Sequence, residues 1–542
     1  ATRLAVEDRD VTEGRRLIAE FKVRHAKSVL LADLQLLEGR LALTAEQPKD
    51  AIAILSPIAG DPMSPAATRS AARYYLGLAY RAAGDEAKAA AILSELAATT
   101  SPANTVGADA RFVVASGLFD SKKYAEAVES LKKYLEERPR GPLVEHAWAY
   151  LAVSLAELGK LDEARQALDS LEKAAPRGET LNPTRVRLAE SALTLKQYAV
   201  AEGLFKSAAA SADPGLKSRA LSGLGFSQAK QNRPTEAAAS FDALLKAAPT
   251  DSLAPEAALS AGRSLEAAGQ EEPALLAYAN VIEKFPKAPQ AASAMLAQAR
   301  LLSRQHRSAE AAKVFQGYLA KYPGGHLTEP AAANAEPSAD SLDATLADYG
   351  WTLVESNRAE EADVVFRRLL DEFPTSPRAA DARLNLAESA YQSKKLDEVE
   401  KLLAPLVAET QTSQEKVDPV VLRQALYRWG RTLADRRDWA NASAVFNRLE
   451  SLTSKDDPIP SREARFWKAE VAFQAGEAQA ALDALKGLLD EAPRTTDPLD
   501  PKPEDWLQLA KIRRLQALIL LEKWQEANDL ATTLEPEFGP TD

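Results

Sequence analysis

The chain of 542 residues contains no cysteine, only two methionines and four histidines. The absence of cysteine excludes disulfides, thiolate metal ligands, a cysteine nucleophile and a lipidated cysteine within this sequence. Aromatic residues make up only 6% of the chain, whereas hydrophobic residues make up 46%. The interior must therefore be built mainly from alanine and leucine, which favours closely packed helices.

Long apolar runs and basic runs are also missing. No stretch approaches the roughly 18 apolar residues that a transmembrane helix needs. The net charge is −11, and the two signs are interspersed along the chain, so neither a nucleic acid nor an anionic membrane surface is an expected partner. The first residues, ATRLAVEDRD, lack the basic and apolar regions of a signal peptide. We therefore expect a mature, trimmed or cytoplasmic start, and the sequence leaves these alternatives open.

A short pattern recurs along almost the whole chain: a small residue is followed four positions later by an aromatic residue or leucine. We call the first the repeat alanine and the second the ring position. The spacing of repeat alanines is 36 to 39 residues, apart from three longer steps of 51, 43 and 46 residues. Because an internal period of this length marks a repeat array, we predict stacked repeats in place of one large core. We use the name repeat alanine for all thirteen residues at this position, although one of them is valine. They are Ala51, Ala89, Ala127, Ala164, Ala201, Ala237, Ala274, Ala311, Ala362, Val399, Ala442, Ala481 and Ala527.

Each repeat has the pattern of two amphipathic helices. In residues 146–159 the apolar side chains recur at three- and four-residue steps, as on one face of a helix. A turn is expected at Gly159, and the second helix covers 161–175 and ends before Pro176, which cannot continue a helix. We therefore predict an all-α protein of about thirteen helix pairs. Residues 10–25 are expected to form the second helix of a degenerate first unit that caps the stack.

Twelve residues before the repeat alanine stands another small residue, which we call the crossing residue. Only glycine or alanine leaves room where two helices cross tightly, and the side chain at the ring position is expected to fill the space beneath the next unit. Deleting one such ring should cost about 3–5 kcal/mol, and enlarging a crossing alanine about 1–3 kcal/mol. The crossing residues are Gly39, Gly77, Ala115, Ala152, Ala189, Gly225, Gly262, Ala299, Gly350, Ala387 and Gly430.

These positions resemble the tetratricopeptide repeat, in which small, tyrosine-like, alanine, phenylalanine and proline residues stand at fixed offsets. The best matches are Leu76-Gly77 with Tyr80 and Ala89, and Leu224-Gly225 with Ala237, Phe241 and Pro249. The resemblance covers nearly the whole chain and implies a right-handed superhelical solenoid of helix pairs. The period exceeds the family's usual 34 residues by about three, and the extra residues lie between units.

Repeats with this longer connection are similar to those of bacterial envelope proteins such as the TolA-binding coordinator and the outer-membrane-assembly lipoprotein. The resemblance implies a location in the periplasm or at the surface of a bacterium, with a cytoplasmic location as the alternative.

The longer steps divide the array. We expect an N-terminal array with its degenerate cap over 1–323, a loop or hinge over 324–341 that is rich in Gly, Pro, Ala and Ser, and a less regular C-terminal array over 342–542. Extra material therefore gathers on one edge of the stack, which is either a contact surface or a place of tolerated variation. The other insertions lie near 408–419, 452–461 and 493–505.

The sequence contains no recognisable catalytic or metal-binding motif. The four histidines are far apart and show no HExxH spacing, and the GxSxG and GK[ST] motifs are absent. The GLG at 223–225 is explained by the crossing residue Gly225, and the carboxylates fall on polar helix faces and turns. We therefore expect a non-enzymatic protein that uses no cofactor and no metal.

The resemblance also implies a binding surface. In the family, the first helices of successive repeats line a concave groove, and the residue after each crossing residue faces it; we call this the groove position. Members that bind a carboxylate place asparagine there, and none of the groove positions of this chain is asparagine, so that ligand class is not expected. The groove positions are Arg40, Leu78, Ser116, Val153, Glu190, Phe226, Arg263, Arg300, Trp351, Glu388, Arg431 and Glu470.

From this surface we predict a protein-binding scaffold of the bacterial envelope that recognises partner segments through the groove and the edge between repeats. For each aromatic residue, packing against the neighbouring unit is the alternative to contact with a partner. The sharpest expectation is that four consecutive first helices present two cations between two aromatic anchors: Phe226, Arg263, Arg300 and Trp351. The predicted partner-binding residues are Tyr74, Phe112, Phe119, Phe226, Arg263, Arg300, Trp351, Tyr391, Tyr427, Arg431 and Phe466.

Three alternatives stay open at this point. The chain is a structural subunit of a larger envelope or extracellular assembly that uses its convex face and insertions. It is a cytoplasmic regulator whose effector domain lies outside this sequence. Or it is an enzyme whose catalytic group follows no known motif.

Overall fold

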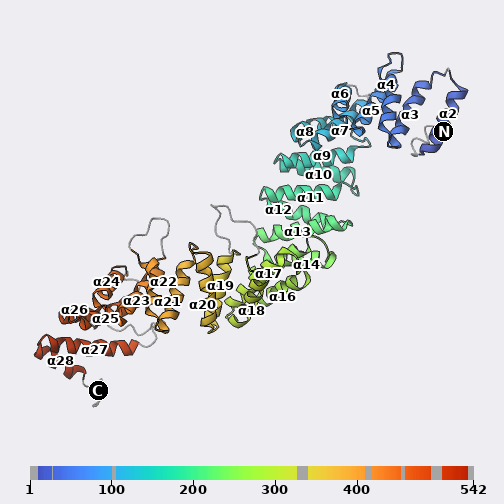
Figure 1. Ribbon diagram of the computed structural model, residues 1–542. Helices are drawn as coiled ribbons and strands as arrows, with labels where there is room; N and C mark the ends of the chain where they lie inside the picture. The colour runs from blue at the N-terminus through green and yellow to red at the C-terminus, as the bar shows by residue number, and fades with distance from the viewer. Residues whose placement is uncertain are drawn as a thin grey trace. The chain divides into compact units, whose positions relative to one another are not determined.

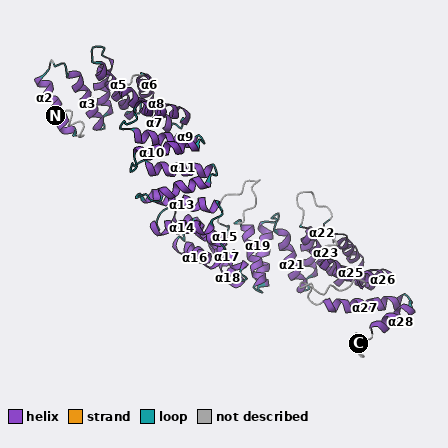
Figure 2. Ribbon diagram, turned by 180° about the vertical axis from the view of Figure 1, so that it is seen from behind, coloured by secondary structure: helices purple, strands orange, loops and turns teal. Residues whose placement is uncertain are grey.

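The computed structural model describes residues 10–26, 28–99, 105–325, 340–408, 418–452, 458–489 and 503–534. The chain divides into two compact units, Ala1–Phe285 and Pro286–Asp542, and each is described by itself. The described residues form 27 helices and contain no strand (Figure 2). The prediction of an all-α fold is confirmed.

The N-terminal unit consists of a single helix, α2, followed by seven helix pairs (Figure 1). α2, Val11–Arg24, is the predicted capping helix. The pairs are α3 Leu31–Thr44 with α4 Pro48–Gly60, α5 Ala66–Ala82 with α6 Glu86–Ala98, α7 Thr105–Asp120 with α8 Tyr124–Glu137, α9 Val144–Glu157 with α10 Leu161–Ala174, α11 Leu181–Thr194 with α12 Tyr198–Ala208, α13 Pro214–Lys230 with α14 Pro234–Ala247, and α15 Ala254–Ala267 with α16 Glu271–Lys284.

The C-terminal unit contains six pairs in its described residues, so the thirteen predicted helix pairs are all present. Every repeat alanine lies in the second helix of its pair. The pairs are α17 Pro289–Arg304 with α18 Ser308–Lys321, α19 Leu342–Glu355 with α20 Ala359–Glu372, α21 Ala379–Gln392 with α22 Leu396–Val407, α23 Pro419–Asp435 with α24 Trp439–Leu452, α25 Pro458–Gln474 with α26 Ala478–Leu489, and α27 Pro503–Leu520 with α28 Trp524–Leu534.

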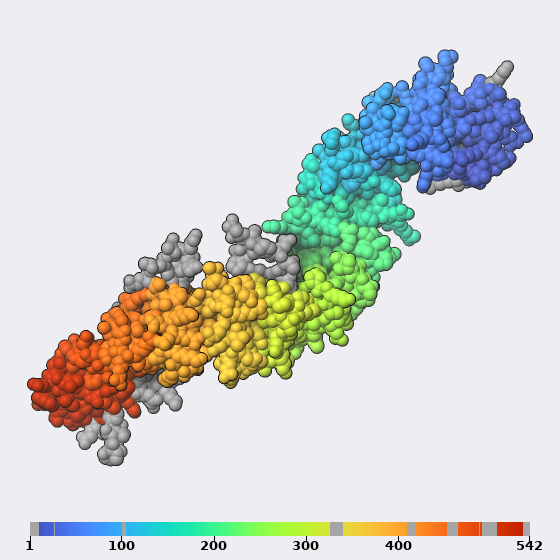
Figure 3. All heavy atoms as spheres, in the orientation of Figure 1, coloured from blue at the N-terminus to red at the C-terminus, as the bar shows by residue number. Residues whose placement is uncertain are grey.

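Within each unit, every helix packs against the helices before and after it in sequence. The colours of the space-filling view follow one another without interleaving inside each unit (Figure 3). Most first helices of adjacent pairs within a unit also contact each other, as α9 does with α11 and α23 with α25. No comparable contact joins second helices in the described parts of either unit. The first helices therefore form the more tightly spaced row, which we call the first-helix face.

The crossing glycines are needed because a large side chain rests on them. A Cβ atom added to Gly350 would lie 2.5 Å from the ring of Phe366, which is fully buried in the second helix of the same pair. The ring of Phe366 therefore rests on its own first helix, and it also belongs to one buried cluster with Ala382 and Leu386 of the following pair. Phe205 reaches further: a Cβ atom at Gly223 in the following pair would lie 2.3 Å from its ring.

The turn inside each pair has the same backbone conformation throughout. Five residues before the repeat alanine, φ is positive in all thirteen pairs and lies between 57° and 84°. Only four of these positions hold glycine, although the left-handed conformation costs other residues roughly 1–2 kcal/mol. The packing of the two helices therefore imposes the turn on the other nine residues.

Most of the predicted hinge over 324–341 lies outside the described residues, and the domain boundary placed there stays a prediction. The insertions near 408–419, 452–461 and 493–505 also fall partly outside the described ranges.

Candidate functional site

Several neighbouring first helices are joined by a recurring contact. The side chain two residues before the crossing residue, which we call the junction residue, lies against the preceding first helix. In the N-terminal unit, the junction residue of α9 is Tyr150, and its ring stacks on Phe119 and Phe112 of α7 at centroid distances of 4.6 and 5.9 Å. Phe112 is also 8% exposed. These two predicted partner-binding rings therefore take part in packing between repeats.

The junction between α3 and α5 places a cation at the groove position, beneath a ring at the junction position. The guanidinium of Arg40 lies 5.0 Å from the ring centroid of Tyr75, the junction residue of α5. Tyr74 packs edge-on against Tyr75 with the centroids 5.2 Å apart. Burial, reinforced by the carboxylate of Asp109, raises the pKa of the Tyr74 hydroxyl. This predicted site residue is half-buried between helices.

In the C-terminal unit, arginine is often the junction residue. Arg428 of α23 pairs with Glu388 of α21 at 2.6 Å and lies 4.1 Å above the ring of Tyr391. Arg513 of α27 donates two hydrogen bonds, of 2.5 and 2.8 Å, to Glu470 of α25. Each arginine thus satisfies a carboxylate at the preceding groove position.

Arg431 makes the opposite arrangement, with the cation at the groove position and the ring at the junction. Its guanidinium carbon lies 3.5 Å from the ring centroid of Trp467, the junction residue of α25. Its Nη1 donates to the hydroxyl of Tyr427 at 3.0 Å. Phe466, another predicted site residue, is 1% exposed and belongs to the core.

Arg300 was expected to be an open cation of the groove, and this expectation is wrong. Its Nε donates to Asp348, the junction residue of α19, at 2.7 Å, and its Nη1 donates to Asp340 at 2.6 Å. Burial by itself would lower the pKa of Arg300, but the bonds to the two carboxylates raise it overall. Arg300 therefore holds α17 to α19.

Three groove positions in the described residues stand outside this network. Phe226 is 37% exposed and Trp351 is 42% exposed, and each touches the buried ring of its own pair only by an edge. Arg263 is exposed and has no ion-pair or hydrogen-bond partner in the described part of the chain. Phe226 and Trp351 lie on first helices, α13 and α19, that make no comparable contact with the next first helix of their unit.

The junction residues next to Phe226 and Trp351 are short. The junction residue of α15 is Ser260, which is too short to reach Phe226 and bonds to Glu256 of its own helix at 3.3 Å. The junction residue of α21 is Asn385, which is also short. No long junction residue covers the groove position at these two junctions, so the aromatic rings of Phe226 and Trp351 stay accessible.

Around Phe226 the first-helix face of the N-terminal unit carries two further cations. Lys230 follows Phe226 by one helical turn on α13 and is exposed, and Arg263 occupies the groove position of the next first helix. We call Phe226, Lys230 and Arg263 the open patch. It combines one apolar anchor with two positive charges that no described side chain neutralises.

Comparison with known proteins agrees with this architecture. Family models described as "Tetratricopeptide repeat" match residues 36–104, 118–180, 186–252, 254–326, 353–418 and 427–494. The chain belongs to the tetratricopeptide repeat family. Such repeats indicate a protein-interaction scaffold, and the comparison with curated proteins found no match to this chain.

Several solved structures are similar. One is a tetratricopeptide repeat protein from Parabacteroides merdae, with 14% identity and a TM-score of 0.31, covering 56% of this chain and 98% of that chain. The C-terminal part of a repeat protein from Cytophaga hutchinsonii has 17% identity and a TM-score of 0.38, covering 50% and 98%. A structure of Naa15/Naa10 bound to HypK-THB has 15% identity and a TM-score of 0.38, covering 85% and 68%.

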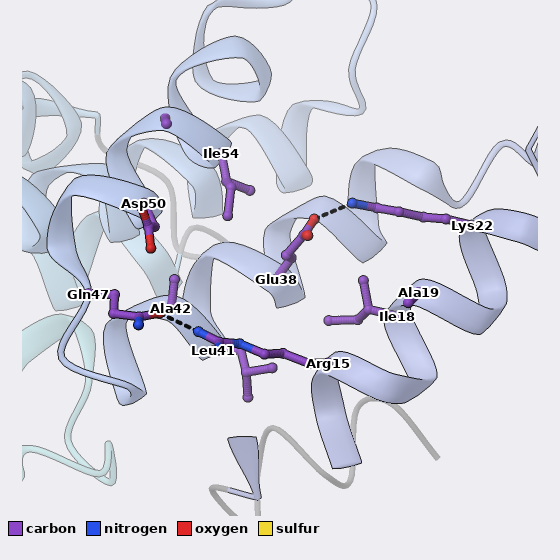
Figure 4. A pocket seen from close by; sticks show the side chains of 11 residues that line it. Arg15, Ile18, Ala19, Lys22, Glu38, Leu41, Ala42, Gln47, Asp50 and Ile54 are labelled. Atoms are coloured by element: carbon purple, nitrogen blue, oxygen red, sulfur yellow. Dashed lines mark hydrogen bonds and ion pairs between the residues drawn. The ribbon is translucent and has the colours of Figure 1, made fainter. Parts of the chain in front are cut away.

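The tetratricopeptide array also has a hollow near its start, between α2, α3 and α4 (Figure 4). Its volume is about 430 Å³, and apolar side chains including Ile18 and Leu41 line it. The hydrogen bond between Lys22 and Glu38, 2.6 Å long, crosses its rim, so one charged pair at the opening is already neutralised.

The described residues contain no cluster of histidines and carboxylates that could hold a metal ion. Of the helices in the described ranges, none combines the length and the apolar character needed to span a bilayer.

Proposed function

We propose that this tetratricopeptide repeat protein is a non-catalytic scaffold that binds a segment of a partner protein on the open patch. The main support for the proposal is that groove residues along the first-helix face differ in whether a neighbouring helix engages them. Groove residues such as Arg300 and Glu470 are engaged by a neighbouring helix, whereas Phe226 and Arg263 remain exposed and unengaged.

The chemistry of the open patch favours a segment with apolar and acidic side chains. Phe226 supplies an aromatic surface on which an apolar side chain is buried, and an aromatic anchor of this kind contributes about 2 kcal/mol or more when it is a hot spot. Arg263 and Lys230 attract carboxylates and orient the segment. In the C-terminal unit, Trp351 offers a second, separate aromatic anchor.

A quantitative pull-down from the native host tests this proposal. The wild-type chain and the variant Phe226→Ala/Arg263→Glu serve as baits, and a matched control carries Leu276→Ala/Arg165→Glu. The control removes an exposed side chain from α16 and reverses an exposed charge on α10, so it makes the same kinds of change on second helices. A partner retained by the wild type and the control but lost by the open-patch variant supports the proposal. A partner retained equally by all three baits contradicts it.

We further propose that the scaffold works in the envelope of a bacterium. The support is the repeat period of about 37 residues, which resembles the longer-period repeats of bacterial envelope proteins. Fractionation of the native host with an antibody against the chain should place it in the periplasm or membrane fraction. Recovery only with cytosolic markers would contradict this location and favour a cytoplasmic regulator.

A further inference from the structure

The two exposed aromatic groove residues lie on helices of opposite charge. Helix α13, which carries Phe226, contains three basic residues and no aspartate or glutamate. Helix α19, which carries Trp351, contains three acidic residues and no lysine, arginine or histidine. The two rings have the same position in the repeat and are similarly exposed, so the charge around them is what distinguishes the two surfaces.

Glu355 places a negative charge one helical turn from Trp351. Residues four apart lie on the same face of a helix, so the two side chains are neighbours on α19. Each of the other two acidic residues of α19, Asp343 and Asp348, is paired with an arginine. Glu355 instead accepts a hydrogen bond of 3.0 Å from the neutral hydroxyl of Ser308, and no lysine or arginine within the described ranges is bonded to it.

Asp381 brings a second carboxylate to this place from the next first helix. It stands six residues before the crossing residue of α21, as Arg219 does on α13. Arg219 bonds to Glu190, the groove residue of the preceding first helix, at 2.6 Å. Asp381 therefore lies on the side of α21 that faces α19. Burial, together with the carboxylate of Asp418, raises the pKa of Asp381, as expected for an acidic group that has another carboxylate as its charged neighbour.

We propose that Trp351, Glu355 and Asp381, which we call the acidic patch, bind a lysine or arginine side chain in a basic segment of a partner protein. The face of a tryptophan ring attracts a cation more strongly than the ring of tyrosine or phenylalanine, and the two carboxylates pair with the same charge. The inference rests on the proposed scaffold function. It concerns the other unit of the chain and a segment of opposite charge to the one that suits the open patch.

The preceding segment of the chain does not match the acidic patch. Residues 326–339, which come before α19, contain two glutamates and no lysine or arginine. A second copy of the chain would offer the cations of its own open patch, so self-association is one of the results that would contradict the proposal.

A phage-displayed library of short random peptides, selected on the full chain, supplies the probe. Peptides that are retained by the wild type but lost by Trp351→Ala should be rich in lysine or arginine. The strongest of them is synthesised with a fluorophore, and its binding to the chain is followed by fluorescence anisotropy. Trp351→Ala should weaken this binding by about tenfold or more. Glu355→Gln/Asp381→Asn should weaken it and also reduce its dependence on salt.

Two further substitutions distinguish a cation on the ring from an apolar contact. Trp351→Phe keeps an aromatic face and should retain part of the affinity, whereas Trp351→Leu should bind as weakly as Trp351→Ala. The matched control is Val364→Ala/Glu360→Gln, which removes one exposed apolar side chain and one exposed carboxylate from α20. The control and the open-patch variant Phe226→Ala/Arg263→Glu should both bind the peptide as the wild type does. Circular dichroism should show wild-type helix content in every variant.

Three results would overturn the proposal. The first is that the peptides are acidic or uncharged, or that none depends on Trp351; if a partner is still captured through the open patch, this inference fails while the proposed function stands. The second is that Trp351→Leu binds as tightly as the wild type, because the ring would then be a purely apolar anchor. The third is a concentration-dependent dimer in analytical ultracentrifugation that Glu355→Lys abolishes, because the occupant would then be a second copy.

Discussion

Two junctions, one in each unit, join first helices in the same place with different chemistry. In the N-terminal unit, Tyr150 stacks on Phe112 and Phe119. In the C-terminal unit, Arg513 bonds to Glu470 and lies over Phe473 at the corresponding position. The comparison teaches that the repeat accepts either a stacked ring or an ion pair at this position. Where the junction residue is Ser260, the groove residue Phe226 stays exposed.

The largest expected effect on stability distinguishes two aromatic rings of the pair α19–α20. The ring of Phe366 is part of the core, whereas the ring of Trp351 is available for binding. Phe366→Ala should lower the free energy of unfolding of the C-terminal unit by about 3–5 kcal/mol, because it leaves a cavity on Gly350. Trp351→Ala should cost far less, since its ring is 42% exposed. Urea unfolding followed by circular dichroism measures both variants. Equal losses would remove the distinction between engaged and open groove residues.

Two arginines, one in each unit, should also differ in how much their substitution lowers stability. Arg513→Gln should destabilise the C-terminal unit by about 1.5–3 kcal/mol, because Glu470 loses a charged, largely buried partner. Arg263→Gln should change the stability of the N-terminal unit by less than about 0.5 kcal/mol, because it is exposed and unpaired. The urea midpoints of the two variants test this contrast, and a costly Arg263→Gln would show a structural role for the open patch.

The turn residues offer a smaller test in the N-terminal unit. Gly159 and Lys196 have φ values of 76° and 58° at equivalent positions of adjacent pairs. Gly159→Ala should cost about 1–2 kcal/mol because a Cβ atom disfavours this conformation, and Lys196→Gly should be stabilising by up to a similar amount. Thermal unfolding of the two variants should shift in opposite directions; shifts in the same direction would contradict the argument that packing imposes the turn.

The smallest effect concerns Asp109 of α7. Burial raises the pKa of Asp109, and the charge of Arg138, 3.9 Å away, offsets this only in part. Because the folded-state pKa lies above the unfolded value, ionisation of Asp109 opposes folding at neutral pH, and this penalty disappears as the pH falls below both values. Asp109→Asn should therefore unfold at a higher urea concentration than the wild type at pH 7. The advantage should vanish by about pH 3; an advantage that persists there would show that desolvation of the carboxylate is not its cause.

The regular features of the fold are predictable from the sequence because they depend on local patterns. Helical periodicity predicts the pairs, Pro176 predicts the end of α10, and the small residue at Gly350 predicts a close helix crossing. The left-handed turn residue is harder to recognise, since glycine is found at only four of thirteen such positions. Its signal is the recurrence of glycine or asparagine five residues before the repeat alanine.

The candidate site is predictable only in part. The groove positions are found by counting from the crossing residues, and this identifies Phe226, Arg263 and Trp351. Whether a groove position is engaged depends on side chains of the next pair, roughly one repeat away in sequence. Asp348, for example, engages Arg300 from a distance of 48 residues in the chain. A recurring long side chain two residues before the crossing residue is the sequence signal that identifies these junctions.

The most direct test of the account is a calorimetric titration of the partner segment recovered in the pull-down. The account predicts that Phe226→Ala lowers its affinity by about 2 kcal/mol or more, and that Arg263→Glu weakens binding further and reduces its dependence on salt. Both variants should keep the urea midpoint of the wild type within error. Wild-type affinity in the double variant Phe226→Ala/Arg263→Glu at low salt would contradict the assignment of the open patch as the binding site.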